Sequence, residues 1–213
     1  MNKISAFEKG HEEFKRVKFK QNEERFRRLV NEGQSPKALF IGCSDSRVMP
    51  SMITGSGLGD LFIIRNIGNF VPPFKPDSDF HSTASAIEYA TSILEVTDII
   101  VCGHSDCGAI GALYKSHTPT EENIHTIKWL ELGSSAKSVA MMTMGSDDTE
   151  ELREYTEKLS VVFQLESLLT YPGVKRRVEE GTLYLHGWHY DISNGDILYY
   201  DDNDSIFKPL IEE

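Results

Sequence analysis

Two segments of the chain place metal-binding residue types directly after apolar runs. Cys43 lies in the segment Gly-Cys-Ser-Asp-Ser-Arg, and His104 and Cys107 lie in the segment Gly-His-Ser-Asp-Cys-Gly. Two thiolates and one imidazole suit Zn²⁺, and three protein ligands leave a fourth position open, as in catalytic rather than structural zinc sites. The spacing alone is moderately specific, because buried or structural residues of the same types remain an alternative.

A carboxylate and a guanidinium follow the first cysteine. Asp45 and Arg47 stand two residues apart, so they can form an ion pair beside Cys43. In isolation, a helix N-cap by Ser44 or Asp45 together with a surface ion pair would explain them. Beside a metal site, this explanation is no longer the favoured one.

Short apolar runs precede both segments and are typical of strands that are covered on both faces. They occupy 38–41, 61–64 and 98–102, and a helix is expected over 82–96, between the second and the third. This alternation predicts a parallel sheet with right-handed crossovers. Ligands of such sheets gather beyond the carboxyl ends of the strands. The two segments should therefore meet there if their strands are neighbours.

The remaining elements complete an α/β fold with a mostly parallel central sheet flanked by helices. Helices are expected over 122–143 and 149–170. A strand over 182–185, a turn at Ser193–Gly195 and a strand over 197–200 predict a C-terminal hairpin. This hairpin is expected to add an antiparallel edge strand to the sheet.

The N-terminal part differs in charge from the rest of the chain. Residues 1–33 are predicted to form a helical arm for oligomerisation, with its helix over 5–31, and 34–213 a single α/β zinc-binding catalytic domain. Residues 1–40 hold 10 Lys and Arg against 6 Asp and Glu, whereas the whole chain carries −11. A basic arm ahead of an acidic body indicates docking onto its own or a neighbour's body. A solvated helix surface is the alternative.

Composition limits the class of protein. The chain has 213 residues, of which 39% are hydrophobic, so it can bury the core of one moderate domain. The net charge of −11 argues against a nucleic-acid partner. No apolar run approaches the ~20 residues that cross a bilayer. Because the N-terminus also lacks the apolar core of a signal peptide, a cytoplasmic protein without a membrane partner is expected.

Taken together, the motifs resemble those of the beta-class carbonic anhydrases. The matching segments are Cys43–Arg47, Arg65–Asn69, Ile87–Ala90, His104–Gly108 and His186–Trp188. They occur in order over about residues 30–200, and jointly they are far more specific than any one of them. The resemblance implies one Zn²⁺ per chain, held by Cys43, His104 and Cys107, and the reversible hydration of CO₂ to bicarbonate and a proton.

The resemblance also implies roles for the residues around the metal. Arg47 would hold Asp45 ionised and away from zinc, and Asp45 would orient the zinc-bound hydroxide for attack on CO₂. An alternative within the family has Asp45 bound to zinc in a closed, inactive state. The implied substrate-binding residues are Gln34, Phe62, Ile67, Tyr89 and Gly108, some of which would act across a subunit boundary.

Subtype and assembly follow from the same resemblance. Members that are regulated by bicarbonate carry a Trp three residues before the first cysteine, where this chain has Phe40. The plant-like, open-site subtype is therefore expected.

The family implies a homodimer or a homotetramer in which the N-terminal arm wraps the neighbour. Competing functions are hydrolysis of CS₂ or COS at the same site, and a non-catalytic zinc-bearing interaction protein.

Overall fold

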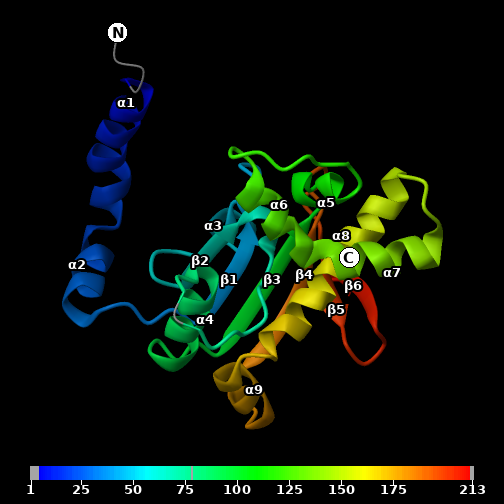
Figure 1. Cartoon of the computed structure of the whole chain (residues 1–213). Coiled ribbons are helices and arrows are strands. Elements are labelled where there is room, and N and C mark those ends of the chain that lie inside the picture. Colours follow the sequence, from blue (N-terminus) through cyan, green and yellow to red (C-terminus); the bar gives the residue numbers. More distant parts are fainter. Residues whose placement is uncertain (1–4, 78, 212–213) are drawn as a thin grey trace.

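The computed structural model describes residues 5–77 and 79–211 and contains a six-stranded sheet flanked by helices (Figure 1). The strand order is β2-β1-β3-β4-β5-β6. The first four strands in this order are mutually parallel, and β5 and β6 are antiparallel to their neighbours. The strands are β1 (Ala38–Cys43), β2 (Leu61–Asn66), β3 (Asp98–His104), β4 (Tyr184–Tyr190), β5 (Ile197–Asp201) and β6 (Ile206–Pro209). The predicted α/β fold is confirmed.

Helices connect the strands and cover the sheet (Figure 1). The arm contains α1 (Ser5–Glu13), a π-helical stretch (Phe14–Phe19) and α2 (Glu23–Glu32). The rest of the chain contains α3 (Pro50–Ile53), α4 (Ser82–Ser92), α5 (Gly108–Leu113), α6 (Ile124–Leu130), α7 (Ser134–Met144), α8 (Glu150–Leu168) and α9 (Pro172–Glu179). Within the described residues, no helix combines the length and the apolar character needed to span a bilayer.

The register of the parallel strands brings the two chemistry-bearing segments together. β1 and β3 are neighbours, and Gly42 pairs with Cys102. Cys43 and His104 therefore end adjacent strands at the same edge of the sheet. Every residue of β1 is buried, as expected for a strand covered on both faces. A well-packed sheet thus fixes the backbone from which the site residues project.

The predictions for the C-terminal part need correction. The strand predicted over 182–185 begins at Tyr184 and continues to Tyr190. β5 does pair antiparallel with β4, but β6 lies outside β5 and is the edge strand. The prediction missed β6 because it is short and half-exposed, without an apolar run. Its turn is built on Ser205, which has a positive φ of 58°, and on ion pairs from Lys208 to Asp201 and Asp204.

Two predicted helices also differ in extent. The helix expected over 122–143 is divided into α6 and α7 by a 3₁₀ turn at Glu131–Gly133. There Leu113 and Phe70 lie so close that a side chain on Gly133 would collide with them. The helix expected over 82–96 ends at Ser92. The other predicted helices match α8 and the arm, the latter with its π-helical stretch.

The arm extends away from the sheet in Figure 1. Its inner end is attached to the same chain, because Arg25 Nη2 on α2 bonds Asp60 Oδ1 at 2.6 Å. Phe14, Phe19 and Phe26 pack their rings against one another, but Phe7 on α1 stays exposed. Residues 1–4 of the arm and 212–213 of the predicted domain lie outside the described residues. The division at residue 33 stays a prediction.

Candidate metal centre and active site

Three potential ligands converge at the carboxyl edge of the sheet. Cys43 ends β1, His104 ends β3, and Cys107 directly precedes α5. The two Sγ atoms and a ring nitrogen of His104 all lie within 4.8 Å of one another, and all three residues are buried. Adjacent parallel strands and the short loop between His104 and Cys107 produce this convergence. The structure therefore brings together the three residues that the sequence pattern singles out.

The His104 ring is oriented by its own backbone neighbour. Nδ1 donates to the carbonyl oxygen of Ser105 at 2.8 Å, which leaves the lone pair of Nε2 free to bind an ion. Among the described residues, this buried Nε2 has no hydrogen-bond partner. An unsatisfied buried polar atom costs about 1–3 kcal/mol, which a bound metal ion would remove. The donor set and this orphaned nitrogen fit Zn²⁺.

A hydrogen bond couples the two thiols. Donation from Cys107 to the sulfur of Cys43 lowers the pKa of Cys43 below its usual range. The pKa of Cys107 is correspondingly raised, by the neighbouring Cys43 and by burial. Backbone N–H groups of Asp45 and Gly68 further favour the Cys43 thiolate. Cys102, in contrast, has its pKa raised to about 12 by burial in the core, so it remains a thiol.

Asp45 and Arg47 form a bidentate ion pair beside the ligands. Asp45 Oδ1 accepts from the backbone N and from Nε of Arg47 at 2.9 and 3.0 Å, and Oδ2 accepts from Nη2 at 2.8 Å. This pairing holds the pKa of Asp45 well below its usual range. Asp45 is not one of the three clustered ligands. The carboxylate is thus ionised and held by the guanidinium.

Arg65, at the end of β2, supports the loop that carries this pair. Its Nε donates to the carbonyl oxygen of Cys43 at 3.0 Å, and its Nη2 donates to that of Asp45 at 2.5 Å. The sequence pattern places Arg65 in a motif but predicts no role for it at this loop. Two bonds to backbone carbonyls are a positioning arrangement that residue types alone do not reveal.

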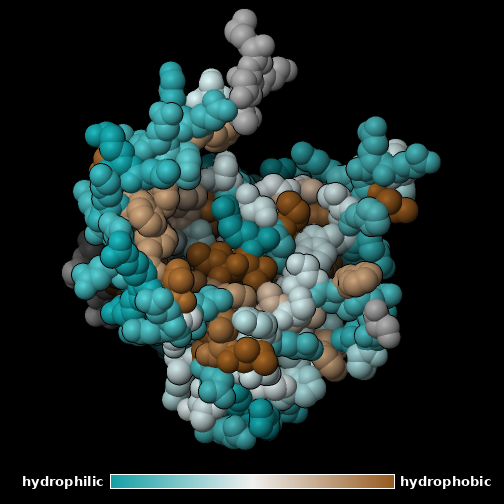
Figure 2. Space-filling model, turned by 90° about the vertical axis from the view of Figure 1, so that its left-hand side faces the viewer, coloured by the Kyte–Doolittle hydropathy of each residue, from teal (hydrophilic) through white to brown (hydrophobic). Residues whose placement is uncertain are grey.

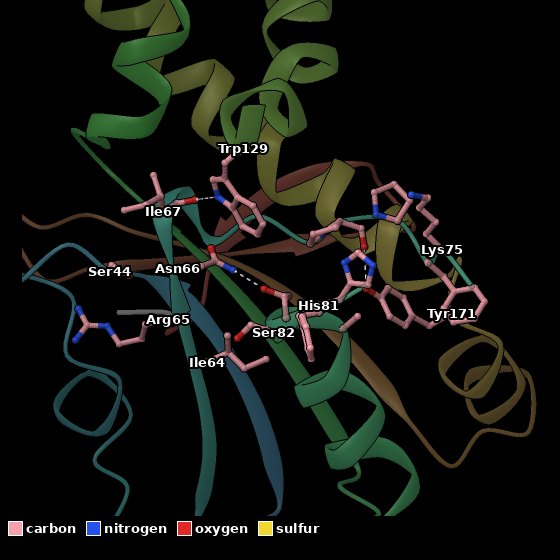
Figure 3. A pocket seen from close by; sticks show the side chains of 16 residues that line it. Ser44, Ile64, Arg65, Asn66, Ile67, Lys75, His81, Ser82, Trp129 and Tyr171 are labelled. Atoms are coloured by element: carbon pink, nitrogen blue, oxygen red, sulfur yellow. Dashed lines mark hydrogen bonds between the residues drawn. The ribbon is translucent and has the colours of Figure 1, made fainter. Parts of the chain in front are cut away.

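A cavity of about 310 Å³ lies beside the ligands. Its wall is mostly apolar and comprises Cys43, Ser44, Asp45, Ile67, Gly108, Ala109, Ala112, Thr126 and Leu130. A larger neighbouring cavity of about 830 Å³ shares Ser44 and Ile67 with it. Figure 3 shows this larger cavity, with the Trp129 indole donating to the carbonyl oxygen of Ile67 at 2.7 Å. Ile67 and Gly108, both predicted to bind substrate, line the smaller cavity.

Three other predicted substrate-binding residues lie elsewhere in this chain. The rings of Phe62 on β2 and Tyr89 on α4 stack with their centroids 5.8 Å apart. Gln34 is exposed and precedes the N-terminal end of β1, whereas Cys43 is the last residue of that strand. None of the three lines the cavity beside the ligands. Their predicted roles in substrate binding stay predictions.

The face that the arm borders carries exposed hydrophobic side chains. Figure 2 shows hydrophobic residues gathered in a hollow on this side of the molecule. β2 is an outer strand of the sheet, and its Ile63 is exposed, as are Tyr89 and Ile93 at the adjacent α4. An outer strand and an apolar hollow of this kind are typical of protein–protein contact surfaces.

Comparisons with known proteins agree with the geometry. A family model described as carbonic anhydrase matches residues 38–197. A carbonic anhydrase of Synechocystis sp. is 39% identical over 192 residues, covering 90% of this chain and 69% of the relative. The solved beta-carbonic anhydrase CcaA superposes with a TM-score of 0.90 at 36% identity, covering 99% of this chain and 93% of the other.

A second solved structure adds information on assembly. One of two tetrameric beta-carbonic anhydrases from the ascomycete Sordaria macrospora superposes with a TM-score of 0.80 at 29% identity. The match covers 99% of this chain and 98% of that one. The similarity therefore extends over the arm as well as the sheet.

Proposed function

The chain belongs to the beta-class carbonic anhydrases, and we propose that its reversible hydration of carbon dioxide to bicarbonate and a proton depends on one zinc ion held by Cys43, His104 and Cys107. The observation that carries this proposal is the buried Nε2 of His104, which faces two thiols and, among the described residues, has no hydrogen-bond partner. When bound, zinc would lower the pKa of a water molecule so that it can attack CO₂, although two thiolate ligands make this water less acidic than one on a zinc ion with three neutral ligands.

Asp45 and Arg47 supply the orientation of the nucleophile. An ionised carboxylate accepts hydrogen bonds only, so Asp45 would fix the direction of the attacking oxygen by accepting a hydrogen bond from its O–H group. The bidentate bond to Arg47 keeps Asp45 ionised and in place. This arrangement supports the open-site subtype, in which Asp45 stays with Arg47 instead of joining the ligand set.

The small cavity beside the ligands suits the substrate. Ile67, Ala109 and Leu130 contribute apolar surface to it, and CO₂ is a small apolar molecule. Gly108 lines the same wall without a side chain and leaves the space beside Cys107 open. Carbon dioxide would therefore be held by van der Waals contact, next to the carboxylate that orients the nucleophile.

A second copy of the chain would complete the site. The outer side of β2, the exposed side chains of α4 and the apolar side of the arm are the surfaces offered for contact. Docking through them would carry Gln34, Phe62 and Tyr89 of one copy toward the cavity of the other. The tetrameric relatives from Sordaria macrospora support a homodimer or a homotetramer of this kind.

The proposed function predicts rapid CO₂ hydration by the purified, zinc-loaded protein. Stopped-flow mixing with CO₂-saturated water and a pH indicator measures the rate, and elemental analysis measures the metal. We expect about one zinc per chain and a rate far above that of buffer alone. A fully zinc-loaded protein without activity, or an active protein without a transition metal, would contradict the proposal.

The proposed assembly predicts that the arm carries contacts between copies. Deleting residues 1–28 should yield a monomer or an aggregate in light scattering coupled to size-exclusion chromatography. A milder variant is Phe7→Ser, because Phe7 is 78% exposed in the single chain and its loss removes no packing there. Phe7→Ser should weaken assembly, whereas Lys9→Ser on the same helix should not. A truncated protein that is a stable, fully active monomer would contradict the proposed role of the arm in assembly.

A further inference from the structure

Helix α8 packs on β3 and β4, and two glycines of these strands face it. A Cβ on Gly103 would lie 2.7 Å from Val161 Cγ2, and a Cβ on Gly187 would lie 2.9 Å from Val161 Cγ1. Such separations are too short for carbon atoms in van der Waals contact. Glycine at both positions therefore lets α8 seat on the sheet, directly behind the strand end that carries His104.

One helical turn before Val161, this close approach places a buried carboxylate behind the ligand loop. Glu157 Oε1 accepts from the backbone N–H of Cys107 at 2.9 Å, and Oε2 accepts from His189 Nε2 at 3.1 Å. The side chains of Glu157 and His189 are each 4% exposed. Burying a carboxylate is unfavourable unless it is hydrogen-bonded, and both of its oxygens are used here.

The peptide unit between Asp106 and Cys107 is consequently held at both ends. Its N–H donates to Glu157, and its carbonyl oxygen accepts from Arg47 Nη2 at 3.2 Å. Asp106 has a φ of 55°, in the left-handed region that non-glycine residues seldom adopt. A strained conformation persists only where its surroundings over-determine it. An anionic and a cationic side chain supply that restraint here.

We propose that Glu157 is a positioning residue that orients the Cys107 thiolate for zinc by holding the Asp106–Cys107 peptide; the inference rests on the proposed zinc site. Arg47 holds the same peptide from the opposite side and also binds Asp45. The ligand loop and the nucleophile-orienting carboxylate are thereby linked through one peptide group. Bonds to an ionised carboxylate are about twice as strong as neutral ones, so the charge of Glu157 contributes to this restraint.

The alternative role for Glu157 is purely structural, as one half of a buried pair with His189. The two roles differ in what they change at the metal. A structural pair affects the stability of the whole fold, whereas a positioning residue changes the affinity and the ligand geometry of the ion. A control for general destabilisation is available at the adjacent Thr156, which is also buried and bonds Leu152 and Tyr114 rather than the ligand loop.

The test compares Glu157→Ala, Glu157→Gln and Thr156→Val with the wild-type protein. Competition with a chromogenic chelator gives the zinc affinity, and the thiolate-to-metal charge-transfer band of the cobalt-substituted protein reports ligand geometry. Glu157→Ala should weaken zinc binding by about 10- to 100-fold, as for other outer-shell partners of metal ligands, and should shift the cobalt band. Glu157→Gln should fall between Glu157→Ala and wild type, because its neutral oxygen can still accept the Cys107 N–H. Thr156→Val should lower the melting temperature but leave both metal readouts unchanged.

Each outcome decides the proposal. Equal zinc affinity and an unshifted cobalt band in Glu157→Ala would overturn it, as would identical metal readouts for Glu157→Ala and Thr156→Val. If Glu157→Ala does not fold, Glu157→Gln decides, and wild-type affinity with a wild-type band in that variant overturns the proposal. A wild-type protein that binds no zinc at all would instead refute the proposed function, so the two failures are distinguishable.

Discussion

Cys43→Ser will lose stoichiometric zinc and more than about 100-fold of the CO₂ hydration rate, because it removes a direct ligand and so exceeds the effect of removing an outer-shell partner. Cys43 is buried between His104 and Cys107, and its low pKa favours the thiolate form that binds metal. Serine offers a poorly acidic hydroxyl at the same place. Metal content per chain and stopped-flow hydration are measured on the same preparation.

A matched control separates loss of a ligand from loss of a buried cysteine. Cys102 is fully buried in the neighbouring strand, where its pKa is raised to about 12. Cys102→Ser should retain zinc and activity even if it unfolds at a lower temperature.

Dialysing the wild-type protein against a chelator should abolish activity, and added zinc should restore it. Full activity in zinc-free Cys43→Ser would contradict the assignment of the metal centre.

Asp45→Asn will lower CO₂ hydration by about 10- to 100-fold while zinc content stays at the wild-type level, because an outer-shell partner is changed and no ligand is lost. Asparagine has the same shape, but its NH₂ group donates where the carboxylate accepted, and it cannot match both N–H groups of Arg47. The nucleophile would lose its orientation. Stopped-flow rates per bound zinc provide the measurement.

The pH dependence of this pair has a defined sign. Arg47 holds the pKa of Asp45 below its usual range, so the pair contributes stability above the unfolded pKa of about 3.9 and loses it as pH falls through the lower, folded value. The difference in unfolding free energy between wild type and Asp45→Asn should therefore be constant above about pH 5 and shrink below it. Asp45 itself should cause no loss of activity between neutral and mildly acidic pH.

A control for any Asp–Arg pair lies at the N-terminal end of α8, where Asp148 precedes the helix and Arg153 lies on it. Asp148 accepts two hydrogen bonds from Arg153 at 2.5 Å each, a bidentate geometry like that of Asp45 and Arg47. Asp148→Asn should leave the hydration rate unchanged, since exposed ion pairs contribute little. If Asp45→Asn and Asp148→Asn were equally active, the orienting role of Asp45 would be wrong.

The metal ligands were predictable because their evidence is local. Cys43 and His104 each end an apolar run, and parallel neighbouring strands expose their carboxyl ends at one edge. These two runs by themselves leave a buried or structural role open, and the resemblance of the combined motifs to a known family favours the metal site. The predicted roles of Gln34, Phe62 and Tyr89 rest on family resemblance instead, since in one chain they lie away from the cavity beside the ligands.

The sequence by itself therefore predicted the strands other than β6, the sheet class and, through the family resemblance, the candidate ligands, since hydrophobic periodicity and ligand chemistry are properties of short segments. Tertiary structure alone decided that Arg47 and Glu157 hold one peptide from opposite sides, across sequence separations of 59 and 50 residues. In the sequence, Glu157 is one of several acids in a charged helix. Its burial depends on how closely α8 seats on Gly103 and Gly187, which is a packing distance that no local pattern encodes.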